Sequence, residues 1–250
     1  TLATVATLAI AIGAITAIFS VVNGVLLEPL PYPESDRLVA LVHQAPGEDL
    51  RDLSASPAMY FTYRDHNRVF ESVALWAGNS ASITGRGDPE EVARLLATHE
   101  LLPTLRVQPL LGRAFTAAED EPGAAPTVLL SYDYWQTRFG GDEAVVGTAL
   151  IVDGTPNEVI GVLPADFRFL DERFDVLAPM KPGREFAFVP STGERGIARL
   201  KDGITLAQAS ADVARMMPIL FDTFPLVPGF SRERVGRMQL GPDLGFLKGQ

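Results

Sequence analysis

The first 27 residues of the chain contain no Asp, Glu, Lys or Arg. They read TLATVATLAIAIGAITAIFSVVNGVLL, and their polar members are Thr, Ser and Asn, whose side chains can hydrogen-bond back to a helix. About 20 apolar residues in a helix cross a hydrocarbon core of roughly 30 Å. Because backbone groups in lipid must be satisfied within the segment, we expect a transmembrane helix over residues 1–27. Pro29, Pro31 and Pro33 follow and predict its end.

A secretory signal peptide and a buried core helix are the alternatives for this run. A signal peptide has a basic region, an apolar stretch of about 7–15 residues and a small-residue cleavage site. The run is longer than that, and no basic residue precedes it in the sequence. A core helix of this length would be unusual in a domain of this size, so the residues favour a membrane span.

A stripe of small residues runs along the same segment. Ala9, Gly13 and Ala17 recur every four residues and therefore share one face of a helix. In lipid, small residues let helix backbones approach closely, so we expect this stripe to be a helix-packing face. The alternative is that Ala and Gly are simply common in membrane helices.

The remaining residues carry the whole net charge of −10. This balance argues against nucleic acid as a partner and against a polybasic lipid-binding surface. Hydrophobic residues make up 47% of the chain, enough for a folded core, and the absence of Cys excludes disulfides and thiolate chemistry. Glu28, Glu34 and Asp36 outnumber Arg37 just after the run, whereas cytoplasmic flanks are usually rich in Lys and Arg. We therefore expect residues from 28 onward to lie outside the cytoplasm.

Strand and helix signals mix with hairpins after residue 35, which favours an α+β fold. Ser56 before Pro57, Ser131, and the pair Thr205 and Gln208 are typical helix N-caps. Pro218 should kink or end the last helix. The expected strands are 36–44, 73–84, 91–98, 127–130, 149–152, 158–162, 175–177, 196–201 and 235–240, and the expected helices are 57–70, 99–105, 132–139 and one from residue 206.

No stretch has the pattern of a catalytic, cofactor-binding or metal site. His43, His66 and His99 pair with no other His or carboxylate at a ligand spacing, so we expect structural or solvated histidines. Ser131 lacks a nucleophile elbow. The acidic residues 119–121 lack the alternation of a calcium loop and predict a solvated loop, and the Arg-Gly-Asp at 86–88 predicts a turn.

Four stretches taken together resemble one family. They are AIGAITAIFSVVNGVLLEPLPYPESDRLV (11–39), YRDHNRVFESVALW (63–76), LLGRAFTAAEDEPGAAPTVLLSYDYWQTRFGGDEAVVGTALIVDGTPNEVIGVLP (110–164) and ARLKDGITLAQASADV (198–213). In this order they resemble the MacB/FtsX-type ABC transporter permeases, most of all the duplicated permeases of acidobacterial type. The resemblance covers nearly the whole chain.

This resemblance implies a two-part extracytoplasmic domain after the membrane helix. A porter-like α+β subdomain would comprise 28–106 and 195–250, and a strand-rich subdomain of 107–194 would be inserted into it. The chain would be a fragment, cut before Thr1 and near a second membrane helix. Relatives usually carry a helix-friendly residue where Pro103 stands and a Gly where Arg106 stands, so the short helix there is expected to be distorted.

The resemblance also implies a function and a location. The chain would be part of a permease in the bacterial inner membrane, with 28–250 in the periplasm, and would transmit ATPase-driven motion for export or efflux. Implied partners are an ATP-binding ABC subunit, a second permease half or an identical copy, the lipid bilayer and a periplasmic adaptor protein. No enzymatic activity and no cofactor are expected, because the chemistry belongs to the ATPase. The alternatives are a membrane-anchored sensor or binding domain and a membrane-anchored hydrolase.

Overall fold

The computed structural model describes residues 30–45, 50–85, 87–170, 172–189, 193–227 and 239–240. The predicted transmembrane helix, with Ala9, Gly13 and Ala17, lies outside these residues, as does part of the expected strand 235–240. Among the residues that are described, no helix has both the length and the apolar character needed to cross a bilayer.

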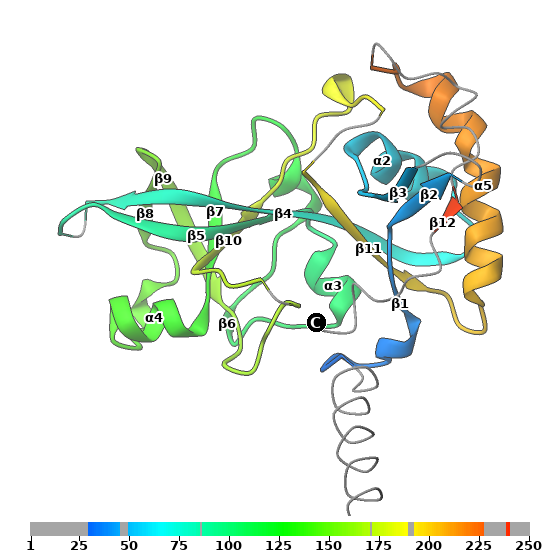
Figure 1. Ribbon diagram of the computed structural model, residues 1–250. Coiled ribbons are helices and arrows are strands. Elements are labelled where there is room, and N and C mark those ends of the chain that lie inside the picture. The colour runs from blue at the N-terminus through cyan, green and yellow to red at the C-terminus, as the bar shows by residue number, and fades with distance from the viewer. Residues whose placement is uncertain are drawn as a thin grey trace, which may run out of the picture.

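A nine-stranded mixed sheet forms the body of the molecule (Figure 1). Its strand order is β1-β11-β4-β5-β10-β7-β9-β6, and β8 pairs with both β4 and β9. Most neighbours are antiparallel, but β10 is parallel to β5 and β7 is parallel to β9. The strands are β1 (Leu38–Ala40), β4 (Phe70–Thr84), β5 (Glu90–Ala97), β6 (Leu111–Gly112), β7 (Thr127–Leu130), β8 (Ala149–Val152), β9 (Thr155–Val162), β10 (Val176–Pro179) and β11 (Arg195–Leu200).

A second, three-stranded sheet has the order β12-β2-β3 and comprises β2 (His43–Ala45), β3 (Leu50–Leu53) and β12 (Gln239–Leu240). The predicted strand 36–44 is therefore wrong as a single element. Its first residues form the 3-10 helix η1 (Ser35–Arg37), its middle forms β1 in the large sheet, and its end joins the small sheet. Leu41, just after β1, still donates its backbone N–H to Gly196 of β11 at 2.8 Å, and the chain joins the small sheet two residues later at His43.

The long hairpin of β4 and β5 connects the two ends of the molecule (Figure 1). The first half of β4 pairs with β11, and its last residues pair with β8. With 15 residues, β4 exceeds the usual strand length of about 3–10 residues, and the burial along it changes accordingly. Val73 to Trp76 are buried on both faces, whereas Ala81 and Ile83 alternate with exposed residues.

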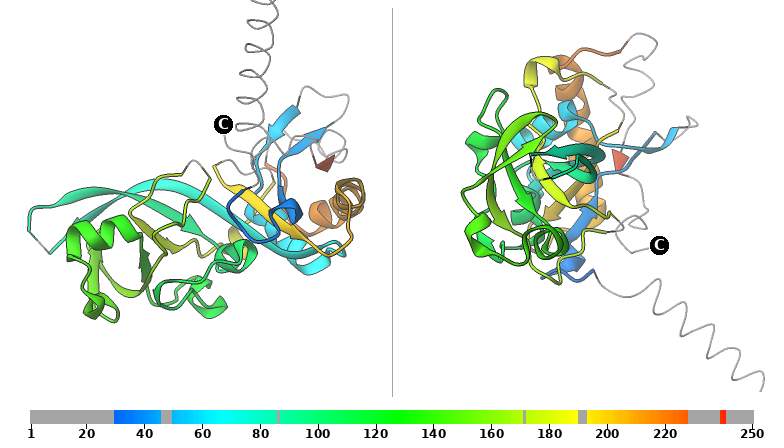
Figure 2. Two further views of the ribbon diagram at one scale, coloured as in Figure 1. Left: turned by 90° about the horizontal axis from the view of Figure 1, so that it is seen from below. Right: turned by 90° about the vertical axis from the view of Figure 1, so that its left-hand side faces the viewer.

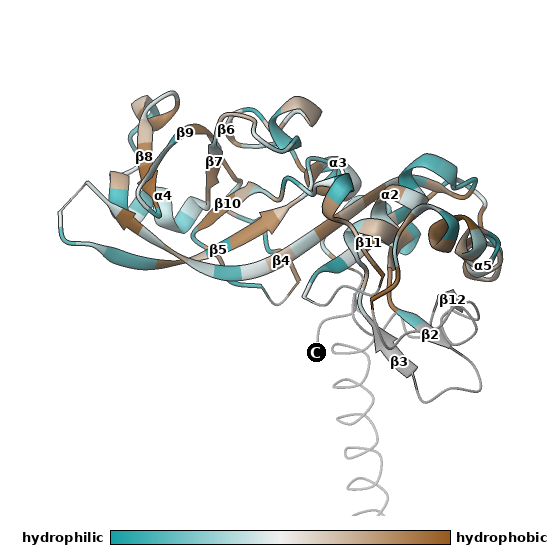
Figure 3. Cartoon of the chain, turned by 90° about the horizontal axis from the view of Figure 1, so that it is seen from above, coloured by the Kyte–Doolittle hydropathy of each residue, from teal (hydrophilic) through white to brown (hydrophobic). Residues whose placement is uncertain are grey.

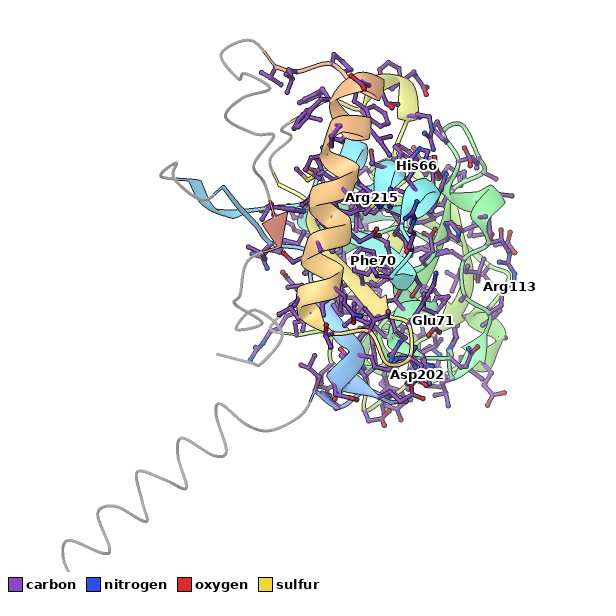
Figure 4. All side chains as sticks on the ribbon, turned by 90° about the vertical axis from the view of Figure 1, so that its right-hand side faces the viewer. His66, Phe70, Glu71, Arg113, Asp202 and Arg215 are labelled. Carbon is purple, nitrogen blue, oxygen red and sulfur yellow. The ribbon has the colours of Figure 1, made fainter. Side chains whose placement is uncertain are left out.

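Helices lie at both ends of this hairpin, and α3 (Leu101–Leu105) lies between them (Figure 1). The α-helices are α2 (Pro57–His66), α3 (Leu101–Leu105), α4 (Tyr132–Phe139) and α5 (Leu206–Thr223), and the other 3-10 helices are η2 (Ala117–Asp120), η3 (Glu143–Val145) and η4 (Arg184–Phe186). Seen from below, α4 and α5 lie at opposite ends of the molecule (Figure 2). Arg215 on α5 donates to the backbone oxygen of His66 at 2.7 Å and so joins α5 to the end of α2 (Figure 4).

Three apolar clusters fill the space between these elements. One lies among α2, α5, β4 and β11 and includes Tyr63 and Met216. The middle cluster surrounds Trp76 and Phe169, whose rings meet edge to face at 5.1 Å. The third lies under α4 around Trp135. Apolar residues also follow β7 and β10 in the hydropathy view, in agreement with the burial of these strands (Figure 3).

The local helix signals in the sequence are confirmed. Ser56 and Ser131 each accept a backbone N–H at the start of α2 and α4, and Thr205 with Gln208 forms a capping box on α5. Pro218 does not end the last helix, since α5 continues to Thr223, and the expected kink stays a prediction. Pro218 lies on the exposed face of α5, while the neighbouring Met216, Met217, Leu220 and Phe221 are buried, so packing keeps the helix intact.

The predicted end of α2 near residue 70 is also wrong. Asn67 ends the helix, and its side-chain oxygen accepts the N–H of Phe70, which starts β4. The mixed α+β class is confirmed. The division into two subdomains stays a prediction. In the sheet, β10, β7, β9, β6 and β8 come from 107–194, and they meet the other strands at two places, the pair of β5 and β10 and the pair of β4 and β8.

Two glycines with positive φ angles allow a test of the contact between β6 and β9. At Gly112 (φ +72°), an added Cβ would lie 2.1 Å from the backbone oxygen of Ile160, whereas at Gly123 (φ +82°) it would meet nothing within 4 Å. Both Gly→Ala changes carry the backbone cost of a left-handed residue, but only Gly112→Ala adds a clash. We expect Gly112→Ala to lower the free energy of unfolding by about 1–3 kcal/mol more than Gly123→Ala, as measured by urea denaturation. Equal losses would show that β6 does not pack tightly on β9.

Candidate functional site

Residues 30–37 follow the apolar run in the sequence and contact distant parts of the chain. The Tyr32 side chain is buried beside Phe167, with 6.4 Å between ring centroids. Its hydroxyl donates to the backbone oxygen of Arg168. Burial raises the pKa of Tyr32 above its usual range, so the hydroxyl keeps its proton and remains a donor. Residues 30–37, named the entry segment, are thereby attached to the loop between β9 and β10.

A buried arginine holds the same segment from the other side. Arg199 on β11 has no exposed surface, and its guanidinium donates to three backbone oxygens. They belong to Thr104 at 2.8 Å, Glu34 at 2.9 Å and Pro33 at 3.0 Å. Burial, together with the nearby positive charge of Arg106, lowers the pKa of Arg199 from its usual value. An arginine pKa starts so high that the side chain stays cationic at neutral pH.

Two carboxylates and two further arginines surround this cation. Arg37 pairs with Glu34 and Glu71, and Arg106 pairs with the same two carboxylates. The hydrogen bond from Arg106, followed by that from Arg37, holds the pKa of Glu34 below its usual range. Arg37 also donates through Nε to the backbone oxygen of Leu200 at 2.8 Å. These residues are named the entry clamp: Glu34, Arg37, Glu71, Arg106 and Arg199.

The backbone at the clamp is unusual at two of its residues. Glu34 has φ 50° and Arg106 has φ 59°, both in the left-handed region that disfavours side chains by about 1–2 kcal/mol. Arg106 caps α3 at the position where Gly is favoured, and its N–H donates to the oxygens of Leu102 and Pro103. α3 forms over Leu101–Leu105 with Pro103 inside it, so the unusual geometry lies at Arg106. The ion pair between Glu34 and Arg106 joins the two left-handed residues directly.

His99 has no partner at a metal-motif spacing in the sequence, but the fold places it beside two carboxylates. Its Nδ1 lies 3.1 Å from Glu100 Oε2 and 3.2 Å from Asp120 Oδ2. Although burial opposes the charge, the hydrogen bond to Asp120 and the charge of Glu100 raise the pKa of His99, and burial raises that of Glu100. His66 is exposed, and His43 is buried with its Nε2 at 2.6 Å from the hydroxyl of Tyr63.

The acidic stretch at 119–121 is ordered rather than a solvated loop. Asp120 is 6% exposed and accepts the backbone N–H groups of His99 and Lys181. Glu119 completes a capping box with Thr116, and the hydrogen bond from Arg113 lowers the pKa of Glu119 to about 2. Sequence patterns missed the His99–Asp120 contact because the two residues are 21 positions apart and meet only in the fold.

A cavity of about 710 Å³ lies between the start of α4 and the loop after β9. Ser131, Phe167, Arg168, Arg173 and Asp175 are among the residues that line it. None of the three histidines of the chain is among its lining residues, so Ser131 has no imidazole base there. Of the Arg-Gly-Asp stretch at 86–88, Arg86 lies outside the described residues.

Comparisons with known proteins agree with this architecture. The sequence profile of the MacB-like periplasmic core domain matches residues 1–216. A domain of a permease protein from Porphyromonas gingivalis is similar with a TM-score of 0.63 and 16% identity over 85% of this chain and 92% of that one. The periplasmic region of MacB from Actinobacillus actinomycetemcomitans is similar with a TM-score of 0.53 and 13% identity, over 73% of this chain and 83% of that one. The extracellular domain of the noncanonic ABC-type transporter YknZ from Gram-positive bacteria is similar with a TM-score of 0.55 and 15% identity, over 82% of this chain and 99% of that one. No curated protein shows significant sequence similarity to the chain.

Among polar sites in the described structure, we expect substitutions in the entry clamp to lower the free energy of unfolding most. Arg199→Met removes the donor to three backbone oxygens while preserving much of the side-chain volume. Leaving these acceptors without a partner should lower the free energy of unfolding by about 3 kcal/mol. Arg173→Met, on an exposed arginine, is the control and should change it by less than about 0.5 kcal/mol. Equal stability of the two variants in chemical denaturation would contradict the importance of Arg199.

Proposed function

The chain belongs to the MacB-like periplasmic core domain family, and from this premise we propose that it passes ATPase-driven motion from the membrane into the periplasm. It is then a piece of a permease subunit of an ABC transport system, placed in the bacterial inner membrane with residues 28–250 in the periplasm. In this proposal the domain works as a mechanical transmitter in export or efflux and is not an enzyme.

The observation that carries the proposal is the entry clamp. Motion of the predicted membrane helix would reach the domain through residues 30–37. There, Arg199 ties Pro33 and Glu34 to β11, and Thr104 ties α3 to the same guanidinium. A hydrogen bond to a charged group contributes about 1.5–3 kcal/mol, so three of them make a stiff connection. A displacement of Glu34 would therefore move β11 and α3 with it.

The sheet offers a route from the clamp to the far end of the domain. Glu71 of the clamp is the second residue of β4, whose other end pairs with β8 through Ile83 and Thr84. One continuous strand thus reaches from the entry segment to the end that carries α4 (Figure 1). A strand hydrogen-bonded on its flanks transmits displacement along its length, which suits a domain that must respond as a unit.

The proposal includes partners that supply energy and complete the pathway. An ATP-binding ABC subunit would drive the membrane helices, and a second permease half or an identical copy would complete the membrane part. A periplasmic adaptor protein would receive the motion, and the bilayer would hold the predicted helix at 1–27. Nucleic acid is not expected, given the net charge of −10.

A membrane-anchored sensor or binding domain is the second candidate, and one feature favours it. The cavity of about 710 Å³ falls within the usual size range of small-molecule sites, about 300–1,000 Å³. Arg168, Arg173 and Asp175 on its wall could orient a polar ligand. Ligand-dependent signalling without any transport would favour this candidate.

Breaking the clamp's exposed ion pairs should uncouple the permease without unfolding the domain. Exposed ion pairs contribute only about 0–1 kcal/mol each, so the double variant Glu34→Gln and Arg106→Gln should keep its thermal unfolding temperature within a few degrees. In the permease that contains this chain, we expect transport per ATP hydrolysed to fall several-fold. Arg138→Gln, which breaks the exposed pair with Glu90 at the other end, is the control. Wild-type coupling in the clamp variant would show that the Glu34–Arg106 pair takes no part in the route, which would then depend on the Arg199 hydrogen bonds to Pro33, Glu34 and Thr104 alone.

The orientation has its own test, because the chain has no native Cys. Gln136 on α4 is exposed, so Gln136→Cys should react with a membrane-impermeant thiol reagent in cells whose outer membrane has been permeabilised. Val128→Cys, at a position that is 1% exposed, should react only after denaturation. Labelling of Gln136→Cys only after lysis of the inner membrane would place the domain in the cytoplasm and reject the orientation.

A further inference from the structure

One group of side chains outside the entry clamp has the composition of a metal site. His99, Glu100 and Asp120 each offer a ligand atom, and these atoms all lie within 4.8 Å of one another. His99 and Glu100 precede α3, and Asp120 ends η2. The fold therefore brings one imidazole and two carboxylates together from separate segments.

The spacing of these atoms suits a small divalent cation. Zinc binds nitrogen and oxygen ligands at about 2.0–2.2 Å in tetrahedral geometry, so neighbouring ligand atoms lie roughly 3.3–3.6 Å apart. His99 Nδ1 lies 3.1 Å from Glu100 Oε2 and 3.2 Å from Asp120 Oδ2. Both distances from the imidazole nitrogen are within a few tenths of an ångström of this spacing, and the two carboxylate oxygens lie within 4.8 Å of each other.

Each carboxylate is oriented by a hydrogen bond that would persist around an ion. The hydroxyl of Tyr60 on α2 lies 2.7 and 2.9 Å from the two oxygens of Glu100, to which it donates. Asp120 accepts from the backbone N–H groups of His99 at 2.9 Å and Lys181 at 2.8 Å. Partners of this kind fix ligand geometry in metal sites and are worth about 10–100-fold in affinity.

The group is also accessible and suitably charged. The side chains of His99, Glu100 and Asp120 are 22%, 17% and 4% exposed. His99 and Asp120 line a cavity of about 140 Å³, which has room for the waters that would complete the coordination, at about 30 Å³ each. A divalent cation would take the place of the imidazole proton between the two carboxylates, in a cavity that Arg64 and Arg184 also line.

We propose that His99, Glu100 and Asp120 bind one zinc ion, with water as a further ligand. The imidazole favours zinc over magnesium or calcium, which prefer oxygen ligands alone. The ion would join the start of α3 to the loop that ends at Asp120, and, through Lys181, to the segment after β10. Its role is that of a brace within the domain, independent of ATP hydrolysis.

Calorimetric titration of the full chain with zinc chloride, after treatment with a chelator and its removal, tests the site. We expect one ion per chain, and His99→Gln and Glu100→Gln should each raise the Kd by about tenfold or more. Tyr60→Phe keeps all three ligands but removes the donor to Glu100, and it should also raise the Kd by about tenfold. His66→Gln, at an exposed histidine, is the matched control and should bind as the wild type does.

Nuclear magnetic resonance of the imidazoles distinguishes this site from other zinc binding. Coordination through Nδ1 should leave His99 protonated on Nε2 and shift its ¹⁵N resonances on zinc addition, with those of His66 unchanged. Circular dichroism of each variant checks that it is folded. Zinc affinity that is unchanged in both His99→Gln and Glu100→Gln, or the absence of any one-to-one binding by the folded wild type, would overturn the proposal.

Discussion

The hydrogen bonds of the Arg199 guanidinium hold the segment through which the chain enters this domain. The guanidinium is buried without exposed surface and donates to oxygens from two separate segments, 33–34 and Thr104. A planar cation with five donors can hold three carbonyls at fixed directions, which an ammonium group on a flexible stem does less well. Glu34 and Arg106 both have left-handed backbone; Arg199 holds the backbone oxygen of Glu34, and an ion pair joins Glu34 to Arg106.

The position of Arg199 in the sheet connects the entry clamp to two neighbouring strands. β11 lies between β1 and β4 in the sheet, so the strand that carries the cation is hydrogen-bonded on both sides. β1 continues directly from η1 of the entry segment, and β4 continues to the far end of the sheet. The entry segment is consequently held by side chains from β11 and also by its own pairing with that strand, through Leu38 and Arg199.

Short-range signals in the sequence predicted short-range structure. The caps at Ser56, Ser131 and Thr205 and the neighbouring strands predicted at 149–152 and 158–162 depend on residues a few positions apart, and they are confirmed. The errors concern packing at long range. Pro218 stays helical because the opposite face of α5 is buried, and His99 meets Asp120 only after 21 residues have folded between them. Arg199 had one usable signal, since a charge inside the apolar strand 196–201 implies a buried partner.

The entry clamp and the proposed zinc site occupy opposite ends of one short helix. His99 and Glu100 stand just before α3, and Arg106 caps its other end. α3 has only five residues, four of them buried, so it has little freedom to bend between these ends. Thr104, the third acceptor of Arg199, also lies within it. A cation bound at His99 and Asp120 would therefore restrain the element against which the clamp holds the entry segment. In the proposed mechanism, a bound metal ion would therefore change how far a displacement of residues 30–37 moves the sheet.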